Sequence, residues 1–140
     1  MDELPQWDDG VVAILSTAGG PAHAIPVSTA VRAGARTIVL ALALRRESLA
    51  RLRADPRVAL TFFAPDVACT AHATAVIVEE PLAEADAVAA VRLDVHGLQD
   101  HRQPRFAIDD GVRWQWTDEQ ARERDAEVRD GLRRLAAAAS

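Results

Sequence analysis

The feature that most constrains the fold is a succession of short apolar runs separated by turn signals rather than by helices. Residues 11–17 are predicted to form a buried strand, and the AGGP that follows is a strong turn signal. Residues 22–32 alternate between two faces, and residues 36–44, after the turn-forming RAGAR, are apolar on both faces. This order predicts an up-and-down arrangement of antiparallel strands in the first third of the chain.

Two more strands are predicted at residues 57–63 and 68–80. In the second of these, Ala71, Ala73 and Ala75 share one face, and such small side chains indicate close packing inside a small barrel or against a neighbouring backbone. No regular alternation of strands and helices runs through the chain, which disfavours a doubly wound parallel sheet. We therefore expect a small antiparallel barrel with appended helices.

Three helices and one hairpin are expected outside these strands. A short helix at residues 47–54 ends before Pro56, an amphipathic helix spans residues 82–92, and a final helix spans about residues 118–136. Thr117 and Gln120 resemble a capping box that opens the last helix. Residues 96–104 are expected to form a loop, and residues 105–116 a hairpin, because Asp–Gly is a preferred tight-turn pair. Together these elements predict one domain, residues 1–140, of mainly β (α+β) class.

Composition and charge exclude several classes of protein. The chain is 49% hydrophobic and 26% charged, as in an ordinary globular protein, and its net charge of −5 argues against a general nucleic-acid binder. No apolar run approaches membrane-spanning length, and the acidic N-terminus lacks the apolar core of a signal peptide. The single cysteine, Cys69, excludes an intrachain disulfide. We expect a cytoplasmic protein without a membrane or nucleic-acid partner.

A cluster of arginines marks a candidate phosphate site. Arg45 and Arg46 stand at the start of the predicted short helix, Ser48 lies in its first turn, and Arg51 lies three residues further on. Free backbone N–H groups at a helix N-terminus attract anions, and guanidinium groups bind phosphate bidentately. Two cations at that end oppose the helix dipole, a small cost that a bound anion would offset. The residues alone also allow a solvated helix start without a ligand.

Other reactive side chains do not form a recognisable constellation. The four histidines are spread over separate segments without metal-ligand spacing, so no metal site is predicted. Cys69 lies in an apolar strand pattern and is expected to be a buried core residue. The sequence contains no nucleophile elbow or glycine-rich phosphate loop, and no catalytic residue is identified. Among the histidines, His72 is the candidate for a pocket residue.

The order of these segments resembles the FMN-binding split-barrel family, the relatives of pyridoxamine 5'-phosphate oxidase. The matching segments are VAILSTA, a Gly-Pro turn, PAHAIPVST, a third apolar strand with a basic helix start, LRADPRVALTF, and ATAVIVEE with the alanine-rich stretch after it. The similarity extends, less specifically, into DHRQP and DGVRWQWTDE, as in an actinobacterial branch of the family. It covers residues 8–120, and the order of several weak motifs supports it.

This resemblance implies a six-stranded antiparallel split β-barrel with peripheral helices, which forms a homodimer with two cofactor sites at the subunit interface. The implied cofactor is FMN or, as in many actinobacterial branches, the deazaflavin coenzyme. The family's phosphate-binding positions map to Arg46, Ser48 and Arg51, with Arg45 adjacent. The second-strand segment that borders the cofactor ring maps to four consecutive residues, Pro26, Val27, Ser28 and Thr29.

The sequence departs from the family pattern at two of the phosphate-binding positions. Many members carry a lysine where this chain has Ser48, and often an asparagine where it has Arg51. Arg51 can replace the lost charge from one turn further on, or the site takes another cofactor or none. Pro26 cannot donate a ladder hydrogen bond, so its strand must bend or lie at an edge. Whether that break also exposes backbone groups to the ring stays open.

Trp114 and Trp116 share one face of the last predicted strand. They are expected to pack in the core or at a dimer interface, or one of them, Trp116, lines the cofactor pocket. The sequence therefore predicts a homodimeric flavoprotein, an FMN-binding split-barrel oxidoreductase that transfers hydride or electrons between flavin and an unidentified small-molecule substrate. A deazaflavin-dependent reductase, and a non-enzymatic cofactor-binding or cofactor-free split barrel, are the alternatives.

Overall fold

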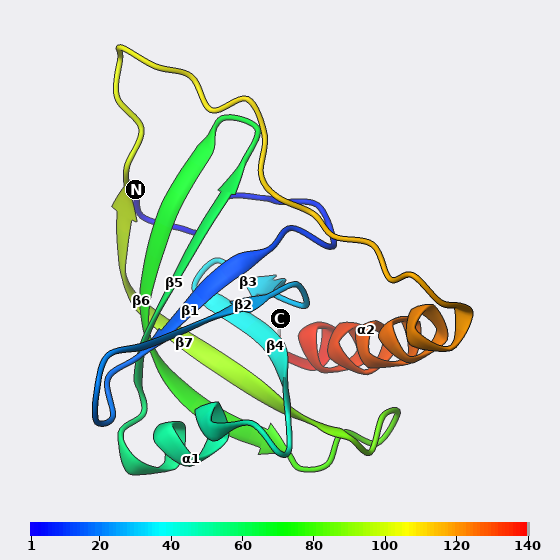
Figure 1. The fold of residues 1–140 in the computed structure, drawn as a ribbon. Helices are drawn as coiled ribbons and strands as arrows, with labels where there is room; N and C mark the ends of the chain where they lie inside the picture. Colours follow the sequence, from blue (N-terminus) through cyan, green and yellow to red (C-terminus); the bar gives the residue numbers. More distant parts are fainter. Residues whose placement is uncertain (140) are drawn as a thin grey trace.

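One antiparallel sheet of seven strands curls into a barrel in the computed structural model, which describes residues 1–139 (Figure 1). The sheet order is β2-β1-β5-β6-β7-β4-β3. The elements in chain order are β1 (Ala13–Thr17), β2 (His23–Val27), β3 (Val31–Gly34), β4 (Thr37–Ala43), α1 (Glu47–Ala54), β5 (Arg57–Ala64), β6 (Val67–Glu79), β7 (Val88–Asp100) and α2 (Glu119–Ala139). The mainly β class, the antiparallel split barrel and its peripheral helices are confirmed.

Alternate residues of the strands fill the barrel interior. Leu15 of β1, Leu60 of β5 and Leu93 of β7 are fully buried there, because side chains two apart in a strand share a face. The small residues Ala71 and Ala73 of β6 also face this core, as their shared face predicts. Small side chains on β6 leave room for the larger side chains of the neighbouring strands.

The sheet remains open between β2 and the β4–β3 edge. The hydrogen-bonded order ends at β2 on one side and at β3 on the other. The two sides are joined by a side chain, because Thr29 Oγ1 accepts a hydrogen bond of 3.0 Å from the backbone N–H of Ala41. Trp7 closes the same region by donating its indole N–H to the carbonyl of Ala30, at 3.0 Å. This opening between β2 and β4 is where the split of the barrel lies.

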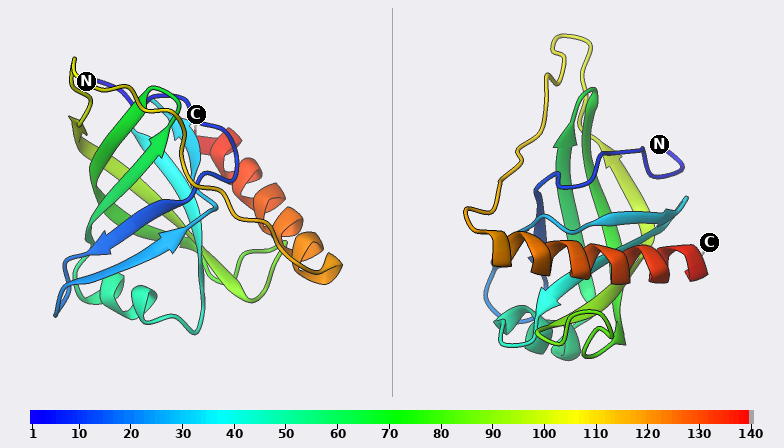
Figure 2. Two further views of the ribbon diagram at one scale, coloured as in Figure 1. Left: turned by 45° about the horizontal axis from the view of Figure 1, so that its top comes forward. Right: turned by 90° about the vertical axis from the view of Figure 1, so that its right-hand side faces the viewer.

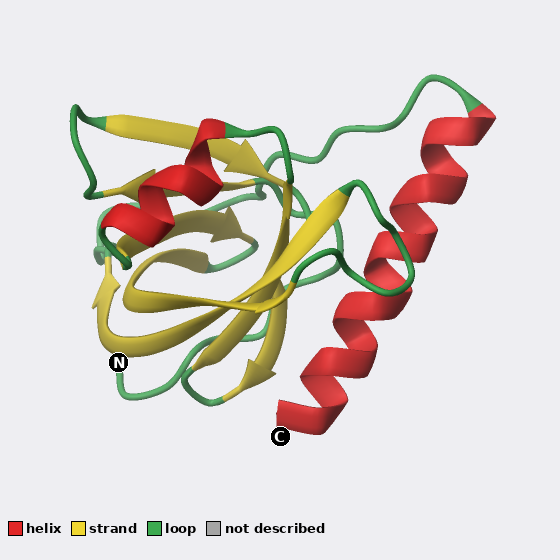
Figure 3. Cartoon of the chain, turned by 90° about the horizontal axis from the view of Figure 1, so that it is seen from below, coloured by secondary structure: helices red, strands yellow, loops and turns green. Residues whose placement is uncertain are grey.

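The two helices cover different parts of the barrel. Helix α1 lies across one end, and its Leu49 and Leu52 are buried in the main core. Helix α2 lies along the outside, over β3 and β4 (Figures 2 and 3). Its Val128 and Leu132 form a second apolar cluster with Leu82. The predicted short helix has the same bounds as α1, and α2 extends the predicted C-terminal helix.

Residues 101–118, named here the strap, connect β7 to α2 as a long irregular segment (Figure 1). The prediction of a hairpin at residues 105–116 is wrong, because the backbone groups of this segment find partners elsewhere. The backbone N–H of Val12 donates to the carbonyl of Val112 at 2.8 Å, and that of Asp66 donates to the carbonyl of Ile108 at 3.0 Å. The strap therefore runs over the barrel instead of folding back on itself.

The cap of α2 also differs from the predicted one. The side chain of Asp118 accepts a hydrogen bond of 2.8 Å from the backbone N–H of Ala121, where Thr117 was expected to be the capping residue. Aspartate satisfies a free N–H of the first turn as well as threonine does, and its negative charge also favours a helix N-terminus. The helix consequently begins one residue later than a cap at Thr117 would place it.

The predicted helix at residues 82–92 is wrong, and the predicted loop at residues 96–104 holds only for residues 101–104, because β7 runs from Val88 to Asp100. Ala89, Ala90 and Val91 are all fully buried, since a central strand between β6 and β4 is covered on both faces. Alanine favours helices, but burial on both faces overrides that local preference. The Gly97 region continues the pairing with β6, opposite His72.

Seven strands are present where six are expected, because residues 22–32 divide into β2 and β3. β2 pairs with β1 up to Val27, and β3 pairs instead with β4 from Val31 onward. Pro26 lies just before the break, as its missing N–H predicts. None of the helices in residues 1–139 is long and apolar enough to span a bilayer.

Candidate functional site

A pocket lies at the opening of the barrel and is named here the β2–β4 pocket. Its volume is about 140 Å³. Its lining comes from β2, β4, the start of α1 and the strap, and consists of Ile25, Pro26, Val27, Ser28, Thr29, Ala41, Leu42, Ala43, Arg46, Trp114 and Trp116. The pocket brings together the second-strand segment, one of the candidate phosphate-binding arginines and one candidate tryptophan, which lie far apart in the sequence.

The floor of this pocket is a stretch where β2 leaves the sheet. Ser28 is buried, and its carbonyl accepts a hydrogen bond of 2.9 Å from Nη2 of Arg129 on α2. Thr29 is held by the backbone N–H of Ala41 on β4. Because both ends of this short segment are fixed by other elements, its conformation is determined by tertiary contacts rather than by the strand ladder.

Arg46 is the charged residue in the lining of the β2–β4 pocket. It is the residue that precedes the first turn of α1, and no side chain caps that turn. Its guanidinium is exposed and makes no hydrogen bond or ion pair with any described residue. Arg45 is also exposed but does not line the pocket. The pocket thus contains a guanidinium without a protein partner at the start of a helix, and such a group suits an anion.

Ser48 lies away from the pocket surface. It is only 1% exposed, and its Oγ lies 3.3 Å from Nε2 of His23 at the start of β2. The hydroxyl therefore has a protein partner on the side that faces the β1–β2 turn. The structure does not bring Ser48 together with Arg46 as lining residues of the same pocket.

Arg51 holds the turn between β1 and β2 against α1. Its Nη1 donates to the carbonyls of Gly19 at 2.7 Å and Pro21 at 2.6 Å, and its Nη2 pairs with Glu47 at 3.0 Å. The side chain is only 13% exposed. Carbonyl groups of the AGGP turn therefore accept hydrogen bonds from a side chain of α1. Arg51 does not line the β2–β4 pocket.

We expect Arg51→Met to destabilise the fold. The substitution keeps the length of the side chain but removes charge-assisted hydrogen bonds to two carbonyls, which predicts a loss of about 1.5–3 kcal/mol in the free energy of unfolding. Urea unfolding followed by tryptophan fluorescence measures this loss. Arg53→Met is the control on the same helix, because Arg53 makes an exposed pair with Glu80. Equal losses of stability in the two variants would contradict the role of Arg51 in holding the β1–β2 turn against α1.

The strap supplies two large aromatic side chains to the site. Trp114 and Trp116 are each 42% exposed, and their rings meet edge to face with centroids 6.3 Å apart. Arg122 of α2 donates to the carbonyl of Trp116 at 2.9 Å and so fixes the end of the strap. Exposed aromatic surface of this size beside a pocket is typical of a binding site. The expectation that this pair packs in the core is wrong, because both side chains are exposed.

A second cavity, named here the α2 pocket, adjoins the first. Its volume is about 360 Å³. It lies between the strap and α2 and is lined by Thr29, Ala41, Val88, Trp116, Ala121, Arg124, Asp125 and Val128. Because Thr29, Ala41 and Trp116 line both pockets, the two cavities are neighbours that share one wall.

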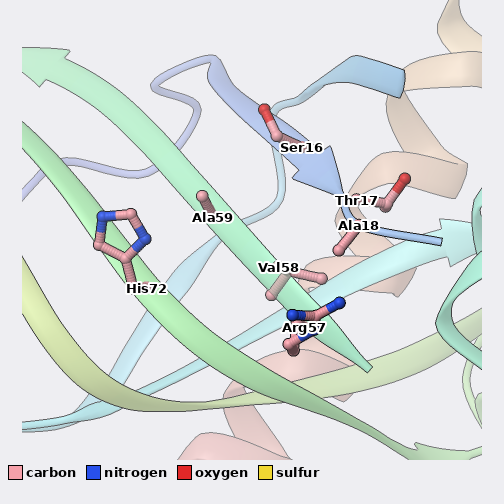
Figure 4. Close-up of a pocket in the computed structure, with 7 residues that line it drawn as sticks. All are labelled: Ser16, Thr17, Ala18, Arg57, Val58, Ala59 and His72. Carbon is pink, nitrogen blue, oxygen red and sulfur yellow. The ribbon is translucent and has the colours of Figure 1, made fainter. Parts of the chain in front are cut away.

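A third pocket, of about 260 Å³, lies on the outer face of β1, β5 and β6 (Figure 4). Its lining residues are Ser16, Thr17, Ala18, Arg57, Val58, Ala59 and His72. His72 therefore does line a pocket, and its Nε2 lies 2.9 Å from Oε1 of Gln99. None of the candidate cofactor-binding residues lines this third pocket, so His72 and those residues belong to different pockets.

Two aspartates that pair with arginines make the fold sensitive to acid. Hydrogen bonds from Arg57, first from its side chain and then from its backbone N–H, lower the pKa of Asp55 to about 2, and Arg102 lowers the pKa of Asp100 to about 2 in the same way. Both pKa values lie below those of the unfolded chain, near 4. The stabilisation is therefore present above about pH 4 and is lost as the pH falls toward 2.

Thermal unfolding between pH 5 and pH 2 tests this dependence. The double variant Asp55→Asn, Asp100→Asn is expected to lose less stability over this range than the original chain, because the two protonation steps are removed. Asp86→Asn is the control, since the Asp86 carboxylate makes no hydrogen bond or ion pair with any described residue. If the stability of the double variant changed with pH as that of the original chain does, Asp55 and Asp100 would not be the source of the acid sensitivity.

The structure adds residues that the sequence did not assign to the site. Ala41, Leu42 and Ala43 line the pocket because β4 lies opposite β2 across the opening, although both strands were predicted. Arg129 supports Ser28 across 101 positions of sequence. A long charged helix gives no sequence signal for such a contact, because any of its arginines could face solvent.

Comparison with known proteins shows similarity in structure. No family model matches the sequence, and no curated protein matches it significantly. A predicted pyridoxamine 5'-phosphate oxidase from Lactobacillus delbrueckii has 16% identity and a TM-score of 0.60, with 71% of this chain and 95% of that chain covered. A homologue of nitrilotriacetate monooxygenase component B from Mycobacterium thermoresistibile has 14% identity and a TM-score of 0.56, with 79% and 87% covered.

An F420 reductase is similar at the same level, with 12% identity and a TM-score of 0.56, and 64% of this chain and 90% of that chain covered. At such identities the similarity concerns the arrangement of the backbone. The chain therefore has the split-barrel fold of the pyridoxamine 5'-phosphate oxidase-like proteins, which the order of its sequence segments predicts.

Proposed function

We propose that the β2–β4 pocket holds a phosphate-bearing flavin cofactor and that the protein is an FMN-binding split-barrel oxidoreductase. The observation that carries this proposal is the unpaired guanidinium of Arg46, which lies at the start of α1 in the pocket that Pro26–Thr29 and the two tryptophans also line. An anionic group and a flat ring system are the chemistry that such a lining recognises. Two of the similar solved structures are, by their descriptions, an FAD-binding protein and the flavin reductase component of a tryptophan halogenase.

The residues present suit the parts of such a cofactor. Arg46 and the first N–H groups of α1 would hold the phosphate, and Arg45 would add charge nearby. The small side chains Ala41 and Ala43 leave room for a ring against the backbone of β4, and Trp116 offers an aromatic edge. A flavin or deazaflavin supplies the hydride or electron transfer when it is bound, and the protein supplies orientation and electrostatics.

A second copy of the chain would complete the site. The β2–β4 pocket encloses only about 140 Å³, whereas pockets for small molecules and cofactors usually enclose about 300–1,000 Å³. The outer face of the sheet carries exposed apolar side chains, among them Ile14 and Phe63 at 41% and 46% exposure. These observations support a homodimer with cofactor sites at the interface, and light scattering after gel filtration measures its mass.

The alternative cofactor is a deazaflavin such as that of the F420 reductase with the same fold. A deazaflavin coenzyme carries a longer anionic tail, and Arg45 beside Arg46 would suit a longer row of negative charges. Ser48 and Arg51 have protein partners, so fewer groups remain for a phosphate than the sequence resemblance implies. A barrel that carries a cofactor without catalysis, or binds none, is the remaining alternative.

The absorbance spectrum of the purified protein and titrations with FMN and F420 test the proposal. We expect Arg46→Gln to weaken FMN binding by about ten- to a hundredfold, since it removes a charge-assisted hydrogen bond. Arg53→Gln is the matched control, because it removes the same charge from an exposed residue of α1 that does not line the pocket. Failure of both cofactors to bind, or equal losses in both variants, would refute the assignment.

A further inference from the structure

The α2 pocket has apolar walls and the volume of a small-molecule site. Val88, Ala121 and Val128 form much of its lining, and Trp116 closes it on the side of the strap. Its volume of about 360 Å³ falls in the usual range for such sites, about 300–1,000 Å³. An indole ring beside aliphatic side chains favours a flat apolar ligand, because ring faces and edges pack well against one another.

The charged residues of the pocket leave one positive charge without a partner. The carboxylate of Asp125 accepts a hydrogen bond of 2.8 Å from Nε of Arg129, and both side chains are largely buried. Asp125 is therefore neutralised within the protein. Arg124, which also lines the pocket, makes no hydrogen bond or ion pair with any residue that the structure describes. A guanidinium in this situation suits a carboxylate, which it can bind with two parallel hydrogen bonds.

Arg129 supports lining residues of both pockets. It links the two pockets, since it contacts Asp125 of the α2 pocket and the Ser28 carbonyl of the β2–β4 pocket. Its Nη1 is buried and makes no hydrogen bond with any described residue. Arg129 itself lines neither pocket, so it supports the lining residues and is not assigned to the ligand.

We propose that the α2 pocket binds a planar aromatic carboxylate, with its ring against Trp116 and its carboxylate toward Arg124. This assignment rests on the proposed function, because it makes the ligand the small-molecule substrate beside the cofactor. Thr29, Ala41 and Trp116 line both pockets, so a ring in the α2 pocket lies next to whatever occupies the β2–β4 pocket. The proposed substrate class therefore has one planar aromatic ring system and one carboxylate.

Calorimetric titration of the full chain with 2-naphthoate and with neutral 2-naphthamide, with and without saturating FMN, tests the proposal. Arg124→Gln is expected to weaken 2-naphthoate binding by about tenfold or more and to leave 2-naphthamide binding nearly unchanged. Ala121→Phe fills the pocket and is expected to weaken both ligands by about tenfold or more. The matched controls are Arg105→Gln, an exposed arginine of the strap, and Ala126→Phe, an exposed site on the same helix.

The outcomes separate this inference from the proposed function. Absence of 2-naphthoate binding, unchanged binding in Ala121→Phe, equal losses in Arg124→Gln and Arg105→Gln, or displacement of 2-naphthoate by FMN would overturn it. Binding with the expected variant pattern in a protein that binds neither FMN nor F420 would refute the proposed function and support the carboxylate site. Circular dichroism checks folding, and Ala121→Leu, with the same expected direction, replaces Ala121→Phe if that variant does not fold.

Discussion

Replacing Leu132 with alanine is expected to lower the free energy of unfolding by about 2–5 kcal/mol. Leu132 is fully buried between α2 and the barrel, where it packs in the cluster that contains Val128 and Leu82. The substitution removes apolar contacts and leaves a cavity that the closely packed neighbours fill only in part. Because α2 forms one wall of the α2 pocket, loosening the helix is also expected to weaken ligand binding there.

Urea unfolding followed by circular dichroism measures the effect of Leu132→Ala. Leu135→Ala is the control on the same helix, since Leu135 is only partly buried against the same cluster. The control is expected to cost clearly less, because less apolar surface is lost to water. If Leu132→Ala and Leu135→Ala lowered the free energy of unfolding by the same amount, Leu132 would not be the main contact that anchors α2 on the barrel.

Replacing Gly111 with alanine is expected to push the strap away from the barrel. A Cβ atom at this position would lie 1.9 Å from the backbone oxygen of Phe63 on β5, a distance that no side-chain rotation can relieve. Overpacking of this kind typically costs about 1–3 kcal/mol. The strap carries Trp114 and Trp116, so its displacement is also expected to weaken FMN binding by about tenfold or more if the proposed function holds.

Thermal unfolding and FMN titration of Gly111→Ala measure the two effects. Gly97→Ala is the control, because a Cβ there would lie 3.8 Å from the Cβ of His72, an ordinary contact. The control is expected to bind FMN as the original chain does. Normal stability together with normal FMN binding in Gly111→Ala would show that the strap does not pack against β5 as described.

Much of the barrel follows from patterns within short segments. The strands β1, β4, β5 and β6 were predicted because alternation and turn signals act over a few residues. The helix α1 was predicted with its observed bounds, since Pro56 and the helical spacing of Leu49 and Leu52 are local signals. The strand β7 was missed because its alanine-rich start has a helical preference that only burial on both faces reverses.

The candidate site was predictable in part. The second-strand segment, Arg46 and Trp116 line one pocket, and their common position agrees with the prediction that they form a site. The separate positions of Ser48 and Arg51 were not predictable, because a helix start exposes several faces and the sequence does not show which face meets the β1–β2 turn. Their cofactor roles remain predictions that the affinity measurements test.

The sequence by itself determined that this chain forms an antiparallel β structure with a basic helix start after a buried strand, because hydrophobic periodicity, proline and turn residues act locally. Only the tertiary structure decided which arginine is free and which is used to hold the fold. Arg51 is drawn to the unpaired carbonyls of the β1–β2 turn and Arg129 to the Ser28 carbonyl, whereas Arg46 and Arg124 have no such partner among the described residues. The physical reason is that carbonyl groups left unpaired by a turn or a strand break need donors, and the donors come from helices far away in the sequence.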